Sequence, residues 1–249
     1  LSESNLAGWL NELNLHSMED LHSWSVHDRD HFTQKLIDSL RIQFQEPPRE
    51  IMNVEAGIEQ VQWLTGARLN IVESCFRDKS DETAVCFQKG SSELQQLSYT
   101  ELKQLTAQVA KGLRAAGYEP GTRIAVMMPM TVESVAIFLG IIAAGCVVVT
   151  IADSFSAEEM QVRLKITKPE LIFIQDVISR GSRQLPLYTK LGAEQRLPAI
   201  VLPEQETLQV PLREGDRPWS EFLSENRELT CEPRNPHDET TILFSSSRA

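Results

Sequence analysis

Residues 121–153, GTRIAVMMPMTVESVAIFLGIIAAGCVVVTIAD, decide the fold of this chain. They contain a short apolar run, Arg123–Met128, and a run rich in β-branched residues, Cys146–Ile151, and both are typical of strands buried on two faces. Between these runs lie thirteen residues without proline, bounded by Thr131 and Gly145, residue types favoured at the start and the end of a helix. The stretch therefore predicts a strand–helix–strand unit with two parallel strands.

A membrane span is the competing interpretation of this stretch. The nineteen residues from Ser134 to Ala152 carry no charge and are about long enough to cross a bilayer. However, Gly140 and Gly145 interrupt the run, its second half has the composition of a strand, and neither a Trp/Tyr belt nor a Lys/Arg cluster flanks it. We therefore favour a buried core and expect no transmembrane segment.

Length, charge and cysteine usage limit the possible functions. A chain of 249 residues can form one large or two modest domains with a substantial core. Its formal net charge of −11 disfavours binding to nucleic acid or to an anionic membrane surface. The cysteines, at positions 75, 86, 146 and 231, are far apart and form no CxxC pair. We therefore expect neither a zinc site nor a disulfide framework. We also expect the protein to occur in a reducing compartment.

The regions on both sides of the central unit continue the alternation of strands and helices. Capping boxes begin two of the helices, at Ser98 with Glu101 and at Ser156 with Glu159. The predicted elements are a hairpin of Ala84–Gln88 and Leu94–Ser98, helices at 99–116 and 157–167, and strands at Glu170–Ile174, Ala199–Leu202 and Thr240–Phe244. This order predicts an α/β fold with a doubly wound, mostly parallel sheet flanked by helices.

The remaining segments are less regular. Residues 1–76 are predicted to form a helical N-terminal extension, in which a capping box at Ser25 and Asp28 begins a helix that reaches Arg41. The histidines of this region could suggest a metal site, but a solvated helix face is favoured. Three later segments are predicted to form a polar turn, a weak helix and a surface excursion with one short helix, namely 176–184, 185–191 and 203–239.

Two short motifs could bind a phosphate group. The last strand runs into Ser245 and Ser246, and small hydroxyl residues after a strand let backbone N–H groups approach an anion. Arg180 and Arg183, with Gly181 between them, could clamp a phosphate or a carboxylate with their planar donors. The alternatives are an ordinary serine-rich terminus and two solvated surface charges. No GxSxG, GxGxxG or paired-carboxylate pattern indicates another chemistry.

Several motifs in a fixed order resemble one family. They are SWSV at 23–26, a pattern of Trp63, Gly66, Leu69-Asn70, Glu73 and Cys75, LSYTEL at 97–102, MPMTVESV at 128–135, the segment 144–156, and TTILFSS at 240–246. Together they resemble the adenylate-forming acyl-CoA synthetases, and most closely the acetyl-CoA synthetase-like branch that includes the plant peroxisomal acyl-activating enzymes. The resemblance covers most of the chain from about residue 20 onward.

This resemblance implies an activity and its cofactors. The family's enzymes join a small-molecule carboxylic acid to coenzyme A (CoA): ATP, with Mg²⁺, first adenylates the carboxylate and releases pyrophosphate, and the CoA thiol then displaces AMP. The resemblance implies that Ser245 and Ser246 begin the loop that binds the ATP phosphates, although Ser247 stands where the family has a glycine.

The resemblance also implies where CoA binds. Asp153 and Ser154, before the pair Phe155-Ser156, match the loop that contacts CoA, and they replace the family's paired glycines. Arg180 and Arg183 match two arginines, three residues apart, that contact the same ligand. No residue of this chain is assigned a catalytic or metal-binding role.

A division of the chain follows from the resemblance. Residues 1–76 are the predicted extension, and residues 77–249 are a partial AMP-binding domain that ends at the phosphate loop. We expect this N-terminal part of a ligase to be inactive by itself, because the acyl pocket and the mobile C-terminal domain of the family are missing from it. The alternative is a non-catalytic, stand-alone binding module derived from the same fold. The resemblance further implies fatty acid metabolism in the peroxisome, or else in the cytosol.

Overall fold

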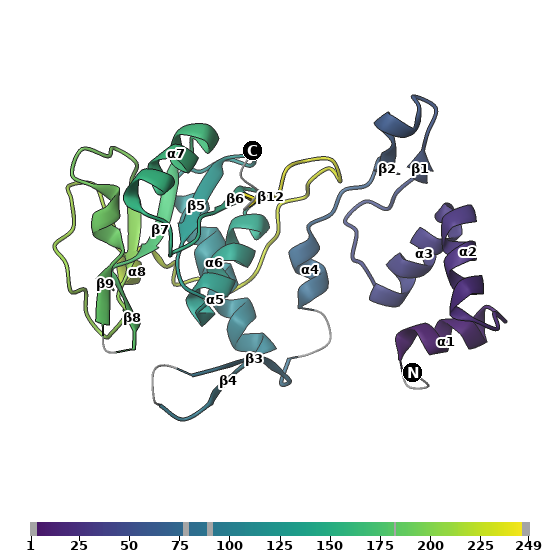
Figure 1. Ribbon diagram of the computed structural model, residues 1–249, viewed down its shortest axis with the longest axis horizontal. Coiled ribbons are helices and arrows are strands. Elements are labelled where there is room, and N and C mark those ends of the chain that lie inside the picture. The colour runs from purple at the N-terminus through teal and green to yellow at the C-terminus, as the bar shows by residue number, and fades with distance from the viewer. Residues whose placement is uncertain (1–3, 77–79, 89–91, 182, 246–249) are drawn as a thin grey trace. The chain divides into compact units, whose positions relative to one another are not determined.

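The computed structural model of the chain describes residues 4–76, 80–88, 92–181 and 183–245 (Figure 1). The chain divides into two compact units. The first comprises Leu1–Arg68 with Asn235–His237, and the second comprises Leu69–Arg234 with Asp238–Ala249. The predicted domain boundary between residues 76 and 77 stays a prediction.

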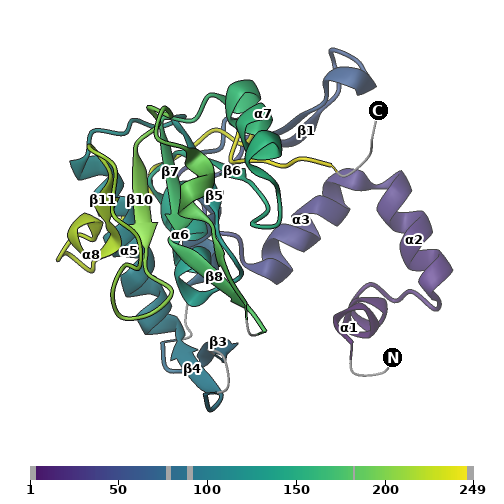
Figure 2. The ribbon, with the colours of Figure 1, turned by 60° about the vertical axis from the view of Figure 1, so that its left-hand side comes forward.

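The second unit is built on a sheet of six strands, and every strand pair in it is parallel (Figure 2). In spatial order the strands are β11 (Arg217–Pro218), β10 (Ala199–Leu202), β7 (Leu171–Gln175), β5 (Arg123–Met127), β6 (Val147–Thr150) and β12 (Thr241–Ile242). The chain passes from β5 to β6 in one direction and from β7 to β10 in the other, so the sheet is doubly wound. The predicted fold class is confirmed, and all five strands predicted for this sheet are present.

The predicted strand–helix–strand unit is confirmed as β5, α6 (Val132–Ala143) and β6. Two residues cap the helix reciprocally: the Ser134 N–H donates to Thr131 Oγ1 at 3.1 Å, and the Thr131 N–H donates to Ser134 Oγ at 2.9 Å. Gly145 has a φ of +80°, a left-handed conformation that ends helices and suits glycine. In the part of the chain that the structure describes, no helix has the length and apolar character needed to cross a membrane.

Helices cover both faces of the sheet. Successive residues of a strand point to opposite faces, so Ile124 belongs to one core and Ala125 to the other. The first core includes side chains of α5 (Tyr99–Ala115) and α6, and the second includes those of α7 (Ala157–Thr167) and the 3-10 helix η2 (Tyr188–Leu191). The uncharged residues 134–152 therefore lie mainly in α6 and β6, and their apolar side chains pack in these two cores.

A glycine allows α5 and α6 to approach each other closely. A Cβ atom added at Gly140 would lie 2.6 Å from both Cβ and Cγ1 of Val109, and 3.0 Å from the Thr106 carbonyl oxygen. Carbon atoms in contact are normally about 3.5–4.0 Å apart. Any larger residue at position 140 would therefore force the two helices apart.

Several local predictions next to the main sheet are also confirmed. The hairpin forms from β3 (Thr83–Phe87) and β4 (Gln95–Ser98), which pair antiparallel. Residues 89–91 of its predicted turn lie outside the described residues. Both predicted capping boxes are present, at Ser98 with Glu101 and at Ser156 with Glu159. The short helix α4 (Ile71–Cys75) precedes the hairpin.

The connection between β7 and β10 differs from the prediction. Residues 176–184, predicted as a turn, contain the strand β8 (Val177–Arg180), which pairs antiparallel with β9 (Arg183–Pro186). The weak helix predicted at 185–191 is reduced to η2. The sequence did not predict this hairpin, because its short strands carry charged side chains and lack the alternating apolar pattern that indicates a strand.

The predicted surface excursion at 203–239 is only partly correct. It contains β11, an edge strand of the main sheet, and the short helix α8 (Trp219–Phe222) that was predicted there. Phe222 is 4% exposed, and its ring centroid lies 5.3 Å from that of Phe173 in an edge-to-face arrangement. The segment therefore contributes to the core as well as to the surface.

The first unit contains three helices, a 3-10 turn and a two-stranded antiparallel sheet within its described residues. They are α1 (Asn5–Glu12), α2 (Met18–His27), α3 (Arg29–Leu40), β1 (Glu50–Asn53), η1 (Ile58–Gln60) and β2 (Gln62–Thr65). The helix start predicted at Ser25 is wrong, because the helix that reaches Leu40 is α3 and its N-cap is Asp28. The Ser17 side chain caps the preceding helix, α2, by accepting from the Asp20 N–H at 3.1 Å. Ser25 lies inside α2 and donates to the His22 carbonyl oxygen at 2.8 Å.

Candidate functional site

A cleft of about 840 Å³ lies at the carboxyl edge of the parallel sheet in the second unit. Its walls come from segments that follow four strands: 128–131 after β5, 152–153 after β6, Gln175 at the end of β7, and 202–205 after β10. Between β5 and β7 the strand order reverses direction, and in open α/β sheets ligands bind outside the carboxyl ends of strands at such a switch point. The cleft is therefore the first candidate for a ligand site.

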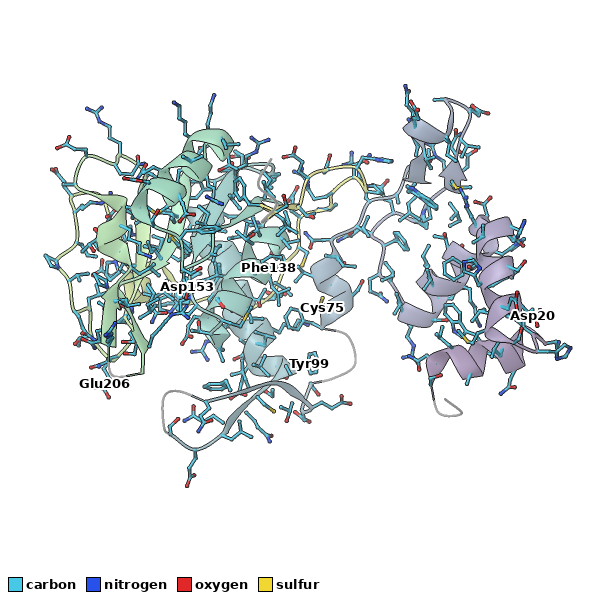
Figure 3. All side chains as sticks on the ribbon, viewed as in Figure 1. Asp20, Cys75, Tyr99, Phe138, Asp153 and Glu206 are labelled. Carbon is cyan, nitrogen blue, oxygen red and sulfur yellow. The ribbon has the colours of Figure 1, made fainter. Side chains whose placement is uncertain are left out.

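Two of the predicted site residues meet at the rim of this cleft. Asp153, labelled in Figure 3, follows β6, and Arg180 ends β8. The Arg180 Nη2 atom lies 3.1 Å from Asp153 Oδ1 and 3.0 Å from Asp153 Oδ2. The Arg180 side chain is 57% exposed, whereas that of Asp153 is only 15% exposed. The structure thus joins two residues that are distant in sequence.

A lysine fixes the segment that carries Asp153. The Lys190 ammonium group donates to the Asp153 carbonyl oxygen at 2.9 Å and to the Phe155 carbonyl oxygen at 2.7 Å. Lys190 belongs to η2, which packs in the second core. The exposed residue Ser154 lies between these two anchored carbonyl groups. The predicted CoA-contacting loop is therefore held to the fold on both sides of Ser154.

Arg183 is brought beside Arg180 by the β8–β9 hairpin. The two residues are directly opposite each other in the antiparallel register. Side chains in such positions lie on the same face, with their Cβ atoms about 4.5–5.5 Å apart, and two like charges there destabilise the pair. Both arginines are exposed, and only Arg180 lines the cleft. The arrangement presents two guanidinium groups toward solvent from one face of a hairpin.

Hydrogen bonds to a buried carboxylate support the far wall of the cleft. Asp176 is fully buried, and its carboxylate accepts from the backbone N–H groups of Val177, Glu204 and Gln209 at 2.7, 2.8 and 2.9 Å. Glu204 in turn accepts from the Ser179 hydroxyl at 2.9 Å. Our reading of the sequence missed this network, although an acidic residue directly after an apolar strand is a signal that could have identified it.

The charged side chains that line the cleft are mostly acidic. Glu133, Asp153 and Glu204 are carboxylates, and Arg180 is the one basic residue among the described lining residues. The interior of the cleft therefore carries a net negative formal charge, and its positive charge is concentrated at the Arg180 rim. Arg180, which lies opposite Arg183 in the hairpin, is therefore the described lining residue that offers a positive charge to an anion.

A second, apolar pocket of about 500 Å³ adjoins the same edge of the sheet. Its lining includes Phe138 of α6 (labelled in Figure 3), Phe155 after β6 and Phe244 after β12. The Arg163 guanidinium carbon lies 3.7 Å from the ring centroid of Phe155 and 5.2 Å from that of Phe244. This contact ties the predicted CoA loop to the residue that precedes Ser245.

The predicted phosphate loop is only partly described. Ser245 is exposed and follows β12 at the carboxyl edge of the sheet, where β6 and the segment of Asp153 also end. Ser246 lies outside the described residues. The position of Ser245 agrees with the rule that anions bind near the carboxyl ends of parallel strands.

The two most buried thiols are poor nucleophiles. Burial raises the pKa of the Cys146 thiol to about 11 and that of Cys231 to about 12. Both thiols therefore stay protonated at neutral pH, and the thiolate is the reactive form. Among the described residues, no three His, Cys, Asp or Glu side chains gather in a way that could hold a metal ion.

The fold and the site define a class of protein. A sequence model of the AMP-binding enzyme family matches residues 72–247, and the chain belongs to this family. The resemblance inferred from the motifs is thereby confirmed.

Two curated relatives and one solved structure specify the likeness. The chain is 40% identical over 220 residues to the "Probable acyl-activating enzyme 18, peroxisomal" of Arabidopsis thaliana, covering 84% of this chain and 30% of the relative. It is 36% identical over 229 residues to hexanoyl-CoA synthase of Cannabis sativa, covering 85% of this chain and 31% of that relative. The acetoacetyl-CoA synthetase from Streptomyces lividans superposes with a TM-score of 0.87 at 25% identity, covering 96% of this chain and 38% of that structure. The chain thus spans 30% to 38% of the length of these proteins.

Proposed function

We propose that this chain supplies the CoA-binding edge, and the start of the ATP phosphate loop, of an ATP-dependent acyl-CoA ligase. One observation carries the proposal: the cross-strand pair Arg180 and Arg183 stands beside a cleft at the switch point of a doubly wound sheet. The similarity to hexanoyl-CoA synthase and to acetoacetyl-CoA synthetase supports this choice of ligand. Such a ligase uses ATP to activate a carboxylic acid and then transfers the acyl group to the CoA thiol.

The arginine pair fits a phosphate of CoA. Each guanidinium group offers planar donors that match phosphate oxygens, and two such groups on one hairpin face can engage the same anion. Their mutual repulsion would fall when a phosphate binds between them. Asp153 lines the cleft at the other end of the Arg180 contact, and Ser154 follows it in the chain; we propose that both face the ligand.

Ser245 and Ser246 would contact the phosphates of ATP, which the ligase would bind together with Mg²⁺. The support is the position of Ser245 after β12, at the sheet edge that also carries Asp153. Hydroxyl groups and backbone N–H groups at such a position can donate to phosphate oxygens. These residues would orient the nucleotide, and none of them would act as an acid or a base.

We further propose that the 249-residue chain does not complete the reaction by itself. It spans about a third of its relatives, and the proposed roles of its residues are limited to binding. We also propose a peroxisomal location, because the acyl-activating relative of Arabidopsis thaliana is named as peroxisomal, with the cytosol as the alternative. The acid that is activated is a small-molecule carboxylic acid whose identity the site residues do not specify.

Isothermal titration of the chain with CoA tests the proposed CoA site. We expect saturable binding, and a loss of about tenfold or more in affinity for Arg180→Ala and for Arg183→Ala, because each removes a charged donor to phosphate. Arg196→Ala is the matched control, since this exposed arginine precedes β10 and so lies toward the opposite edge of the sheet. Equal affinities for all four proteins, or no binding by any, would refute the proposed site.

A stand-alone binding module derived from the same fold is the competing function. ATP–pyrophosphate exchange with short and medium fatty acids tests whether the chain performs the first half-reaction. We expect no exchange above a blank without protein. CoA binding without exchange would agree with either a module or an incomplete ligase, whereas exchange would contradict our proposal that the chain alone is inactive.

A further inference from the structure

The arginine proposed to bind phosphate already has an anionic partner in the chain. One nitrogen of Arg180, Nη2, lies within 3.0 and 3.1 Å of the two carboxylate oxygens of Asp153. A phosphate group that approaches Arg180 would therefore meet the negative charge of Asp153 at close range. The family resemblance places paired glycines at this point of the loop, whereas this chain has Asp153 and Ser154.

The aspartate is the fixed partner of the pair. Its side chain is 15% exposed, against 57% for Arg180, and its backbone carbonyl oxygen accepts from Lys190 at 2.9 Å. Asp153 therefore cannot move far when a ligand binds. The exposed Arg180 side chain has more freedom, so a phosphate must either share the guanidinium group with Asp153 or draw it away.

We propose that Asp153 is a specificity-determining residue that weakens anion binding at Arg180, so that only a ligand able to engage Arg183 as well binds with useful affinity. This inference rests on the proposed CoA site. A small lone anion, such as inorganic phosphate, competes poorly with a carboxylate that is already in place. A nucleotide ligand such as CoA, which places a phosphate beside both arginines and further groups in the cleft, overcomes that competition.

The sign of one substitution distinguishes this role from the alternatives. Asp153→Asn keeps the shape of the side chain and removes its charge. If Asp153 competes for Arg180, the substitution raises the affinity for CoA. If the carboxylate itself accepts hydrogen bonds from CoA, the substitution lowers the affinity. If the ligand contacts only the backbone of this loop, the affinity does not change.

The experiment is a titration of CoA and of inorganic phosphate into the whole 249-residue chain. We expect Asp153→Asn to bind CoA about two- to fivefold more tightly than the wild type, the range expected for an ion pair at the surface. The affinity for inorganic phosphate should rise by at least as large a factor. The gain should shrink in 1 M salt, where the screening length falls to about 3 Å.

Two further variants test whether the effect passes through Arg180. Glu133→Gln is the matched control, because it removes the same charge from the lining of the same cleft, whereas the ion pair of Arg180 is made with Asp153. We expect its gain in affinity to be clearly smaller than that of Asp153→Asn. In an Arg180→Ala background the gain from Asp153→Asn should fall to the level of the gain from Glu133→Gln. Equal gains for the two carboxylate variants, or an undiminished gain without Arg180, would overturn the proposal.

The outcomes separate this inference from the function on which it rests. If the wild type binds CoA and Asp153→Asn binds it equally or more weakly, the role of Asp153 is refuted while the CoA site stands. If neither protein binds CoA at millimolar concentration, the CoA site and the inference both fail. Thermal unfolding of each variant confirms that the compared proteins are folded.

Discussion

Asp176→Asn is the substitution whose consequence can be worked out most fully from the structure. The Asp176 carboxylate is fully buried and accepts three backbone N–H groups. One oxygen, Oδ1, accepts from Val177 and Glu204, and the other, Oδ2, accepts from Gln209. An asparagine has a single acceptor oxygen and an NH₂ group. In its better orientation the NH₂ group would therefore face the Gln209 N–H, donor against donor.

The expected loss of stability is about 3 kcal/mol. An unsatisfied buried donor costs about 1–3 kcal/mol, and hydrogen bonds to a charged acceptor contribute about 1.5–3 kcal/mol against about 1 kcal/mol for a neutral one. The Gln209 hydrogen bond is lost and the other two are weakened, and their separate costs would sum to more than about 3 kcal/mol. Effects within one hydrogen-bond network are not additive, so we expect about 3 kcal/mol in total. The opposite orientation of the amide would cost more, since the NH₂ group would then face two donors.

Urea unfolding followed by circular dichroism measures this loss, and amide hydrogen exchange locates it. We expect a lower denaturation midpoint and faster exchange at the amides of Glu204 and Gln209. Glu206→Gln is the matched control, because this exposed side chain (labelled in Figure 3) belongs to the same loop and undergoes the same chemical change. An Asp176→Asn protein that unfolds within about 0.5 kcal/mol of the wild type, the range of ordinary surface substitutions, would refute the reasoning.

Three other predictions follow from packing and charge. Gly140→Ala should destabilise the chain by about 1–2 kcal/mol in urea unfolding, because overpacking against Val109 outweighs the gain in helix propensity. Gly8→Ala in α1 is the control: a Cβ there meets no atom within 4 Å, so the change should be neutral or stabilising. Burial raises the pKa of the Cys146 thiol from 9.0 to about 11, so the stability that the protonated thiol contributes should be complete below pH 9 and lost as the pH rises to 11. In unfolding titrations, Cys146→Ala should reduce this pH dependence. Arg163→Lys should cost about 1 kcal/mol through loss of guanidinium stacking on two phenylalanine rings, with Arg196→Lys as a neutral control in thermal unfolding.

The sequence singled out the residues of the proposed site but did not predict their arrangement. Arg180 and Arg183 stood out because they are three residues apart near a glycine, but they were expected on a turn. The structure instead sets them opposite each other on two short strands. The Asp153–Arg180 contact spans 27 residues of sequence, and no local pattern reports a contact of that separation. The two residues were linked beforehand only through the family resemblance.

What the sequence by itself determined is the class of the fold. Apolar strands, helix caps and glycines act through neighbours in the chain, so the unit from β5 to β6 and the capping boxes of α5 and α7 could be predicted from composition and order. The tertiary structure alone decided which side of β5 each later strand joins, and thus where the cleft opens. It also decided that the Asp176 carboxylate is buried among three N–H donors and that Asp153 forms an ion pair with Arg180. Such contacts depend on how distant segments pack and not on which residues are adjacent in the chain.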